Sequence, residues 1–284
     1  MKLFESRPSR LFSLLGIVAL FPLAVVGTIF LGQHRFIYHP RPYPSNYQHL
    51  LPKGALELHF KTGEGTQTAF YLNAKDGSLL PNRIWVAFCG NGSLALDWLL
   101  LANADTKAED AFLLIDYPGY GRSEGYATIA TTRSAGEGAL TALAAHLQIS
   151  EASLKPRLNA IGHSLGAAVA LDFATRHPVQ RVILVSPFTS MRAEAAYVFG
   201  SWVSILVREN YDNRAALHLL ARRRPPPRVT IFHGAEDSLI PARMGKELAT
   251  EFPSFVSFHL VAHAGHNDIV LTAEAEIIAS MRDN

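Results

Sequence analysis

The sequence predicts an α/β domain in which helices cover both faces of a mostly parallel central sheet. Short apolar runs that suit buried strands alternate along the chain with longer segments rich in helix-forming residues. A Gly-x-Ser-x-Gly segment, residues 162–166, lies between one such strand and one such helix. Two later strands run into loops that carry histidine and carboxylate side chains. Polar groups are therefore expected where the strands of an open parallel sheet end.

Length and composition are those of a single folded domain with one additional N-terminal segment. The chain has 284 residues, of which 49% are hydrophobic and 18% charged, so it can bury a sizeable core. The formal net charge is +2 and no basic stripe with interleaved aromatic residues appears, which argues against a nucleic-acid partner. Cys89 is the single cysteine, so an intrachain disulfide is impossible.

The N-terminal segment from Leu11 to His34 is apolar and has no acidic or basic residue before its final histidine. A helix needs about 20 such residues to cross a bilayer. A cleaved signal peptide is the alternative, but its apolar core usually spans only roughly 7–15 residues. We therefore expect a single-pass membrane protein with a tail and anchor at 1–35 and a folded domain at 36–284. Positive charges on both sides of the anchor leave the orientation open.

The folded domain begins with a spacer and a hairpin. The Pro-rich stretch 39–44 is a stiff connector that cannot be helical. The runs 56–62 and 67–72 flank Gly63-Glu64-Gly65, a pattern typical of a β-hairpin. Apolar runs and helical spacing then predict strands at 84–88, 112–115, 158–161, 181–185, 229–232 and 256–261 and helices at 131–147 and 167–174.

The Gly162-His163-Ser164-Leu165-Gly166 segment has the context of a nucleophile elbow, a sharp turn between a strand and a helix. Such a turn strains the serine backbone, and only glycine fits two residues before and after it. Ser164 would project from the tip of the turn. The helix that follows points N–H groups and its positive dipole end at the same place, which favours a developing oxyanion.

A serine hydroxyl needs a base and an acid, in the chain order serine, acid, histidine. The strand at 229–232 leads into His233-Gly234-Ala235-Glu236-Asp237, which offers two carboxylates. The strand at 256–261 leads into a loop with two histidines, His263 and His266. A metal pair is the alternative interpretation of these histidines, but no third ligand occurs at a suitable spacing, so no metal is expected.

Six segments in the same order resemble the α/β-hydrolase superfamily, and more closely its membrane-anchored serine-hydrolase branch. The resemblance runs from about Phe36 to the C-terminus. It is carried by Cys89-Gly90-Asn91-Gly92, Asp116 to Gly125, the elbow at 162–166, Ser186-Pro187-Phe188-Thr189-Ser190, His233 to Asp237, and Gly265-His266. One departure is Cys89-Gly90, where this branch usually has a histidine-glycine pair.

The resemblance implies the roles of the site residues. It selects Asp237 as the acid and His266 as the base, beside Ser164 as nucleophile. It implies that the backbone N–H groups of Asn91 and Leu165 form the oxyanion hole. It places a short lid at about 188–227, whose apolar side chains could line an acyl pocket, lie near the membrane surface or simply pack against other helices.

The predicted function is that of a serine hydrolase that cleaves carboxylic esters through an acyl-enzyme intermediate. It requires no cofactor, and its expected partners are a small-molecule or lipid-like acyl substrate and, through the N-terminal helix, a membrane. The same side chains also serve thioesterases, protein deacylases and serine peptidases, so these activities remain alternatives. A catalytically weak, membrane-tethered binding module is the alternative of another class. The oligomeric state stays open.

Overall fold

A computed structural model describes residues 26–28, 30–74, 80–104 and 110–282. The strands of the sheet follow one another along the chain much as the apolar runs predict. They are β1 (Leu56–Thr62), β2 (Gly65–Leu72), β3 (Arg83–Phe88), β4 (Asp110–Ile115), β5 (Leu158–His163), β6 (Arg181–Val185), β7 (Arg228–Gly234) and β8 (Val256–Val261).

These strands form one sheet in the order β1-β2-β4-β3-β5-β6-β7-β8. The predicted hairpin is confirmed, because β1 and β2 pair antiparallel, and β2 also pairs antiparallel with β4. The pairs from β4 through β8 are parallel. The α/β fold with a mostly parallel sheet is therefore confirmed.

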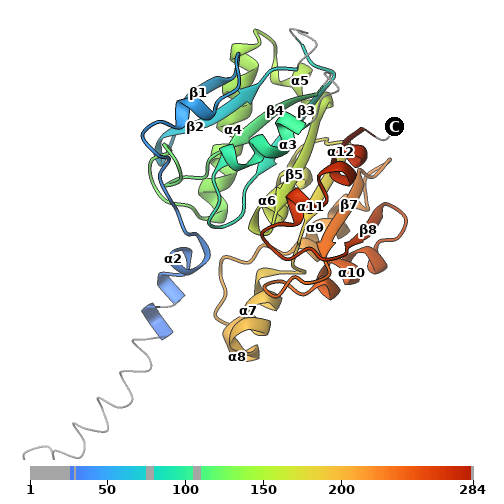
Figure 1. Ribbon diagram of the computed structural model, residues 1–284. Helices are drawn as coiled ribbons and strands as arrows, with labels where there is room; N and C mark the ends of the chain where they lie inside the picture. The colour runs from blue at the N-terminus through green and yellow to red at the C-terminus, as the bar shows by residue number, and fades with distance from the viewer. Residues whose placement is uncertain (1–25, 29, 75–79, 105–109, 283–284) are drawn as a thin grey trace, which may run out of the picture.

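Helices cover both faces of the sheet (Figure 1). The helices are α2 (His34–Ile37), α3 (Leu99–Ala104), α4 (Ile129–His146), α5 (Glu151–Leu154), α6 (Leu165–Arg176), α7 (Met191–Phe199), α8 (Ser201–Ser204), α9 (Asn213–Leu220), α10 (Ala242–Glu251), α11 (Ile269–Thr272) and α12 (Glu274–Arg282). On one side of the sheet α6 contacts both α4 and α9. Helix α3 contacts α11 and α12. Short 3₁₀ turns lie at Tyr47–Leu50, Ala95–Trp98 and Lys155–Arg157.

The core is formed by the central strands, which are buried on both faces because helices pack on each side. Every residue of β4 is buried, and β3 and β5 each have a single partly exposed residue. In the parallel register Phe88 of β3 lies beside Gly162 of β5, and Val185 of β6 lies beside His163. The loops that leave β3, β5, β6 and β7 therefore start side by side at one edge.

The predicted location in a membrane is not borne out. Among the described residues there is no helix with the length and apolar character needed to span a bilayer. Residues 11–25 of the expected anchor lie outside the described residues. From residue 30 onward the segment packs against the folded domain, where Gln33 is buried.

Candidate active site

Ser164 lies between the last residue of β5 and the first residue of α6 and has a strained backbone, with φ 56° and ψ −120°. Non-glycine residues rarely adopt a positive φ. The turn is tight enough that a Cβ at Gly162 would overlap the Gly166 carbonyl, and one at Gly166 would overlap the Phe88 carbonyl. Donation from the Ser164 N–H to Val185 O, at 2.8 Å, fixes the turn to β6. The local geometry is that of the predicted elbow.

Asp237 and His266 form a hydrogen-bonded pair. The Nδ1–H of His266 donates to Oδ2 of Asp237 at 2.8 Å. The other carboxylate oxygen accepts the backbone N–H groups of Leu239 and Ile240 at 3.0 and 2.8 Å. Burial disfavours the charge on Asp237, but hydrogen bonds from His233 and His266 outweigh it and hold the pKa of Asp237 below its usual value. The carboxylate therefore orients His266 and leaves Nε2 as the acceptor.

Two further histidines, His163 and His233, contact the residues of this pair and the loops that carry them. The Nε2–H of His163 donates to the backbone carbonyl of His266 at 2.8 Å, and the two rings lie 4.9 Å apart. Burial lowers the pKa of His163 to about 4, so this side chain is neutral at physiological pH. The Nε2–H of His233 donates to Ile240 O at 2.9 Å and lies 3.5 Å from Oδ2 of Asp237. Both histidines position the loops that carry the pair.

The alternative acid, Glu236, and the alternative base, His263, lie apart from the Asp237–His266 pair. His263 pairs with Glu236 at 3.3 Å, and its side chain is 91% exposed. This pair faces solvent, whereas the side chains of Asp237 and His266 are buried. Among the described residues no group of three or more His, Cys, Asp or Glu side chains could hold a metal ion.

The loop that leaves β3 is held by two tyrosines from the loop after β4. Tyr117 donates its hydroxyl to Cys89 O at 2.7 Å, and Tyr120 donates to Asn91 O. Cys89 itself is buried. These bonds fix the carbonyls of the loop that carries the candidate N–H of Asn91. Leu165 is the first residue of α6, so its N–H has no partner within its own helix.

A cavity of about 810 Å³ opens over Ser164 and His266. This volume is in the range of small-molecule sites. Its walls are mostly apolar and come from the candidate lid, the loop after β7 and the N-terminal segment. The lining residues include Phe36, Ile37, Met191, Ala195, Val198, Phe199, Trp202, Val203, Leu206, Val207, Leu239 and Ile240. Side chains of the candidate lid thus line this cavity, one of the three roles considered for them.

Glu194 of α7 brings a carboxyl group into the same cavity. Its Oε2 atom is buried without a hydrogen-bond partner in the part of the chain that the structure describes. Burial raises the pKa of Glu194 to about 7, and the nearby His266 opposes that rise. No sequence pattern pointed to this residue, because a glutamate in a helix is ordinarily exposed to solvent.

The chain resembles other proteins over most of its length. An uncharacterized protein of Mycobacterium tuberculosis is 30% identical over 266 residues, which are 91% of this chain and 89% of that relative. A family model described as serine aminopeptidase, S33, matches residues 86–224. The chain belongs to the α/β-hydrolase superfamily. The comparisons support this superfamily and not its membrane-anchored branch.

Solved α/β-hydrolase structures share the fold of this α/β hydrolase. An α/β hydrolase from Vibrio vulnificus aligns with TM-score 0.65 and 17% identity, over 91% of this chain and 93% of that one. The Pyrococcus furiosus esterase Pf2001 aligns with TM-score 0.62 and 13% identity, over 86% and 96%. A thioesterase domain from the curacin biosynthetic pathway aligns with TM-score 0.55 and 12% identity, over 81% and 100%. At these identities the likeness concerns the fold alone.

Proposed function

We propose that this α/β hydrolase is a serine hydrolase that cleaves carboxylic esters of apolar acyl groups, with Ser164, His266 and Asp237 as its triad. The observation that carries the proposal is the 2.8 Å hydrogen bond from His266 to Asp237 beside the cavity that Ser164 also lines. An acid that holds the imidazole through Nδ1 leaves Nε2 free to take a proton from a serine hydroxyl.

The reaction follows the ordinary acyl-enzyme sequence. Oγ of Ser164 attacks the ester carbonyl carbon while its proton passes to Nε2 of His266. The N–H groups of Asn91 and Leu165 stabilise the oxyanion, the bond to the leaving group breaks, and His266 returns the proton to the departing alcohol. Water, deprotonated by the same imidazole, then attacks the acyl carbon. The bond from that carbon to Oγ of Ser164 breaks, Oγ takes the proton back from His266, and the carboxylic acid is released. Each step uses side chains and N–H groups of this chain, and Asp237 stabilises the imidazolium.

An ester panel tests the proposal. The full chain is assayed with nitrophenyl esters of increasing acyl length, alongside Ser164→Ala, His266→Ala and His263→Ala. We expect the first two variants to lose at least about 10⁴-fold in kcat, while the exposed His263→Ala retains wild-type activity within about twofold. Equal loss in His263→Ala and His266→Ala would contradict the assignment of the base.

Aminopeptidase activity is a second candidate, favoured by Glu194. A carboxyl group in the cavity can bind the free amino group of a peptide, and the matching family model is described as serine aminopeptidase. Amino-acid anilides, with and without a blocked amino group, discriminate the two candidates. An aminopeptidase would cleave the anilide with a free amino group and would not cleave the blocked one. Glu194→Gln would also abolish cleavage of the free anilide. Hydrolysis of simple esters alone would support the esterase proposal instead.

A further inference from the structure

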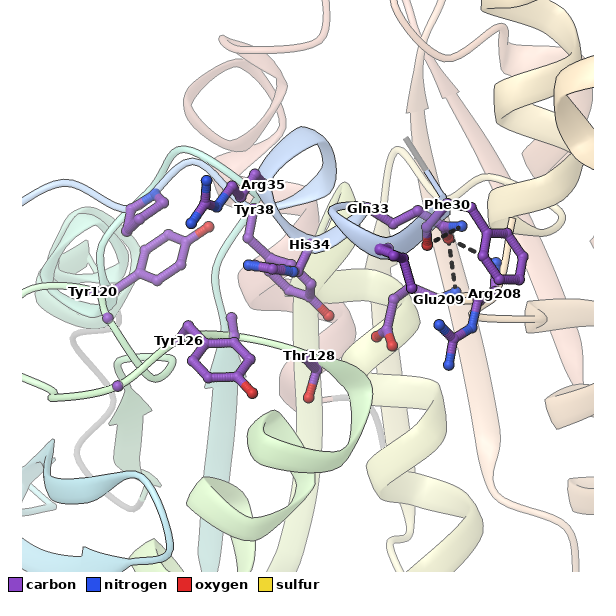
Figure 2. A pocket seen from close by; sticks show the side chains of 15 residues that line it. Phe30, Gln33, His34, Arg35, Tyr38, Tyr120, Tyr126, Thr128, Arg208 and Glu209 are labelled. Atoms are coloured by element: carbon purple, nitrogen blue, oxygen red, sulfur yellow. Dashed lines mark hydrogen bonds between the residues drawn. The ribbon is translucent and has the colours of Figure 1, made fainter. Parts of the chain in front are cut away.

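The side chain of Gln33 ties the segment just before the folded domain to the lid. The side chain is buried, with the residue 8% exposed. Its amide nitrogen donates to Phe30 O at 3.1 Å and to Leu206 O, and its amide oxygen accepts the N–H groups of Arg208 and Glu209 at 2.7 and 3.3 Å. The amide thus uses both hydrogens and both lone pairs, which is its full capacity. Figure 2 shows the bonds that join Gln33 to Phe30, Arg208 and Glu209.

Neighbouring contacts fix the same stretch of the lid, the residues just after α8. The Arg208 guanidinium lies 4.9 Å from the centre of the Phe30 ring, a cation–π distance. The Glu209 carboxylate accepts the N–H of Ile129, the first residue of α4, at 2.7 Å. The chain just after α8 is therefore held between the N-terminal segment on one side and the start of α4 on the other.

Gln33 also lies between two cavities. It lines the catalytic cavity together with Phe36 and Ile37 of its own segment. On its other side it lines the cavity of about 660 Å³ shown in Figure 2. Farther along the segment, the N–H of His39 donates to Asn91 O at 2.9 Å, in the candidate oxyanion loop. The stretch from Gln33 to His39 therefore connects the lid to the oxyanion loop along one wall of the pocket.

We propose that Gln33 is a positioning residue that sets the acyl-length selectivity of the pocket by holding the lid residues Leu206 and Val207 in place. The proposal rests on the serine-hydrolase function proposed above. A short acyl group contacts the region near Ser164 and makes little use of the lid, whereas a long one extends along the lid side chains. Loosening this stretch of the lid therefore weakens binding of long acyl groups and leaves the chemistry at Ser164 intact.

The test compares Gln33→Ala and Gln33→Glu in the full chain with Gln180→Ala. Gln180 is a matched control, because its side chain is exposed and donates to Pro156 O at 2.9 Å. It lies just before the start of β6, at the end of the strands opposite to Ser164. KM and kcat are measured for nitrophenyl butyrate and nitrophenyl decanoate. Labelling by a small fluorophosphonate reports the reactivity of the serine independently of acyl length.

For Gln33→Ala we expect KM for the decanoate to rise by about tenfold. This is roughly the effect of losing the net contribution of one hydrogen bond that orders the lid. Butyrate turnover and labelling should stay within about twofold of wild type, as should every parameter of Gln180→Ala. Gln33→Glu keeps one acceptor oxygen for Arg208 and Glu209 but loses the donors to Phe30 O and Leu206 O and turns a carboxylate oxygen toward these carbonyls, so it should shift KM in the same direction by at least as much. Trypsin should also cut faster after the exposed Arg208 in Gln33→Ala.

Two results would overturn the proposal. One is an equal loss on butyrate and decanoate, which indicates a merely structural role for Gln33. The other is unchanged kinetics with both esters in a folded Gln33→Ala. If the alanine variant does not fold, Gln33→Glu decides between the same outcomes. Failure of the underlying function has a different signature, namely a folded wild type that the fluorophosphonate does not label.

Discussion

The buried carboxylate of Asp237 is held on both sides, by two backbone N–H groups at Oδ1 and by His266 at Oδ2. Replacing Asp237 with Asn keeps the shape and removes the charge that stabilises the imidazolium. We expect Asp237→Asn to lower kcat by about 10³- to 10⁴-fold with little change in the fold. Steady-state kinetics and circular dichroism measure the two effects.

The neighbouring Glu236 offers a matched control for that variant. It carries the same functional group one residue earlier, but its side chain is exposed and pairs with the exposed His263. Such surface pairs contribute little, so Glu236→Gln should leave kcat within about twofold of wild type. A larger loss in Glu236→Gln than in Asp237→Asn would contradict the choice of Asp237 as the acid.

Glu194 should make stability depend on pH. Burial raises its pKa to about 7, from an ordinary value near 4.5. The folded protein then keeps a proton that the unfolded chain releases, so Glu194 makes folding less favourable as pH rises through this window. The variant Glu194→Gln does not titrate, and its melting temperature relative to wild type should increase from pH 5 to pH 8.

The comparison between variant and wild type isolates Glu194 from other buried groups. Burial also raises the pKa of Asp116 to about 7, and burial lowers the pKa of His177 to about 4. Both groups remain in the variant, so their contributions cancel in the difference. A difference in melting temperature that stays constant over this pH range would show that Glu194 is ionised throughout.

At the scale of elements, the elbow depends on the close approach of α6 to β5. A methyl group at Gly162 would overlap the Gly166 carbonyl, so Gly162→Ala should lower the free energy of unfolding by several kcal/mol or prevent folding. Gly136 in α4 is the control, because a Cβ there would lie 3.9 Å from the Phe173 ring. Gly136→Ala should raise the free energy of unfolding by about 0.5–1 kcal/mol, since alanine favours the helix. Urea unfolding of both variants checks the pair, and equal effects would contradict this account of the turn.

The loop after β3 depends on the loop after β4. Tyr117→Phe removes the hydroxyl that donates to Cys89 O, so the loop bearing Asn91 should lose its fixed geometry. Because the oxyanion forms only during the reaction, we expect kcat to fall by about tenfold while KM changes little. Tyr126→Phe, at an exposed ring, is the control and should match wild type. A rise in KM with unchanged kcat would place the effect of Tyr117 on substrate binding instead.

For the whole molecule, local sequence patterns predicted the strands well because the central strands are buried on both faces and are therefore uniformly apolar. The run at 181–185 coincides with β6, which is buried apart from its first residue, and the run at 256–261 coincides with β8, which lies at the edge of the sheet and is largely exposed. The candidate site was predictable for a related reason, since the register of a parallel sheet brings the loops after β3, β5 and β7 together. The roles of Ser164, Asp237 and His266 nevertheless remain proposals.

Other features depend on contacts between distant segments, which one sequence does not reveal. The apolar character of residues 11–34 suggested an anchor, but Gln33 at its end is buried against the lid. Glu194 belongs to the pocket only because α7 turns that side chain toward His266. Tyr117 and Tyr120 hold the carbonyls of Cys89 and Asn91 through hydroxyl groups that come from another strand's loop.

The central claim is that Ser164 is an activated nucleophile. The most direct measurement is the intact mass of the folded full chain after incubation with a fluorophosphonate, followed by peptide mapping of the adduct. We predict one adduct per chain, on Ser164, that is absent in Ser164→Ala and in His266→Ala. A folded wild type that stays unlabelled, or an adduct on another residue, would contradict the claim and favour a catalytically silent binding domain.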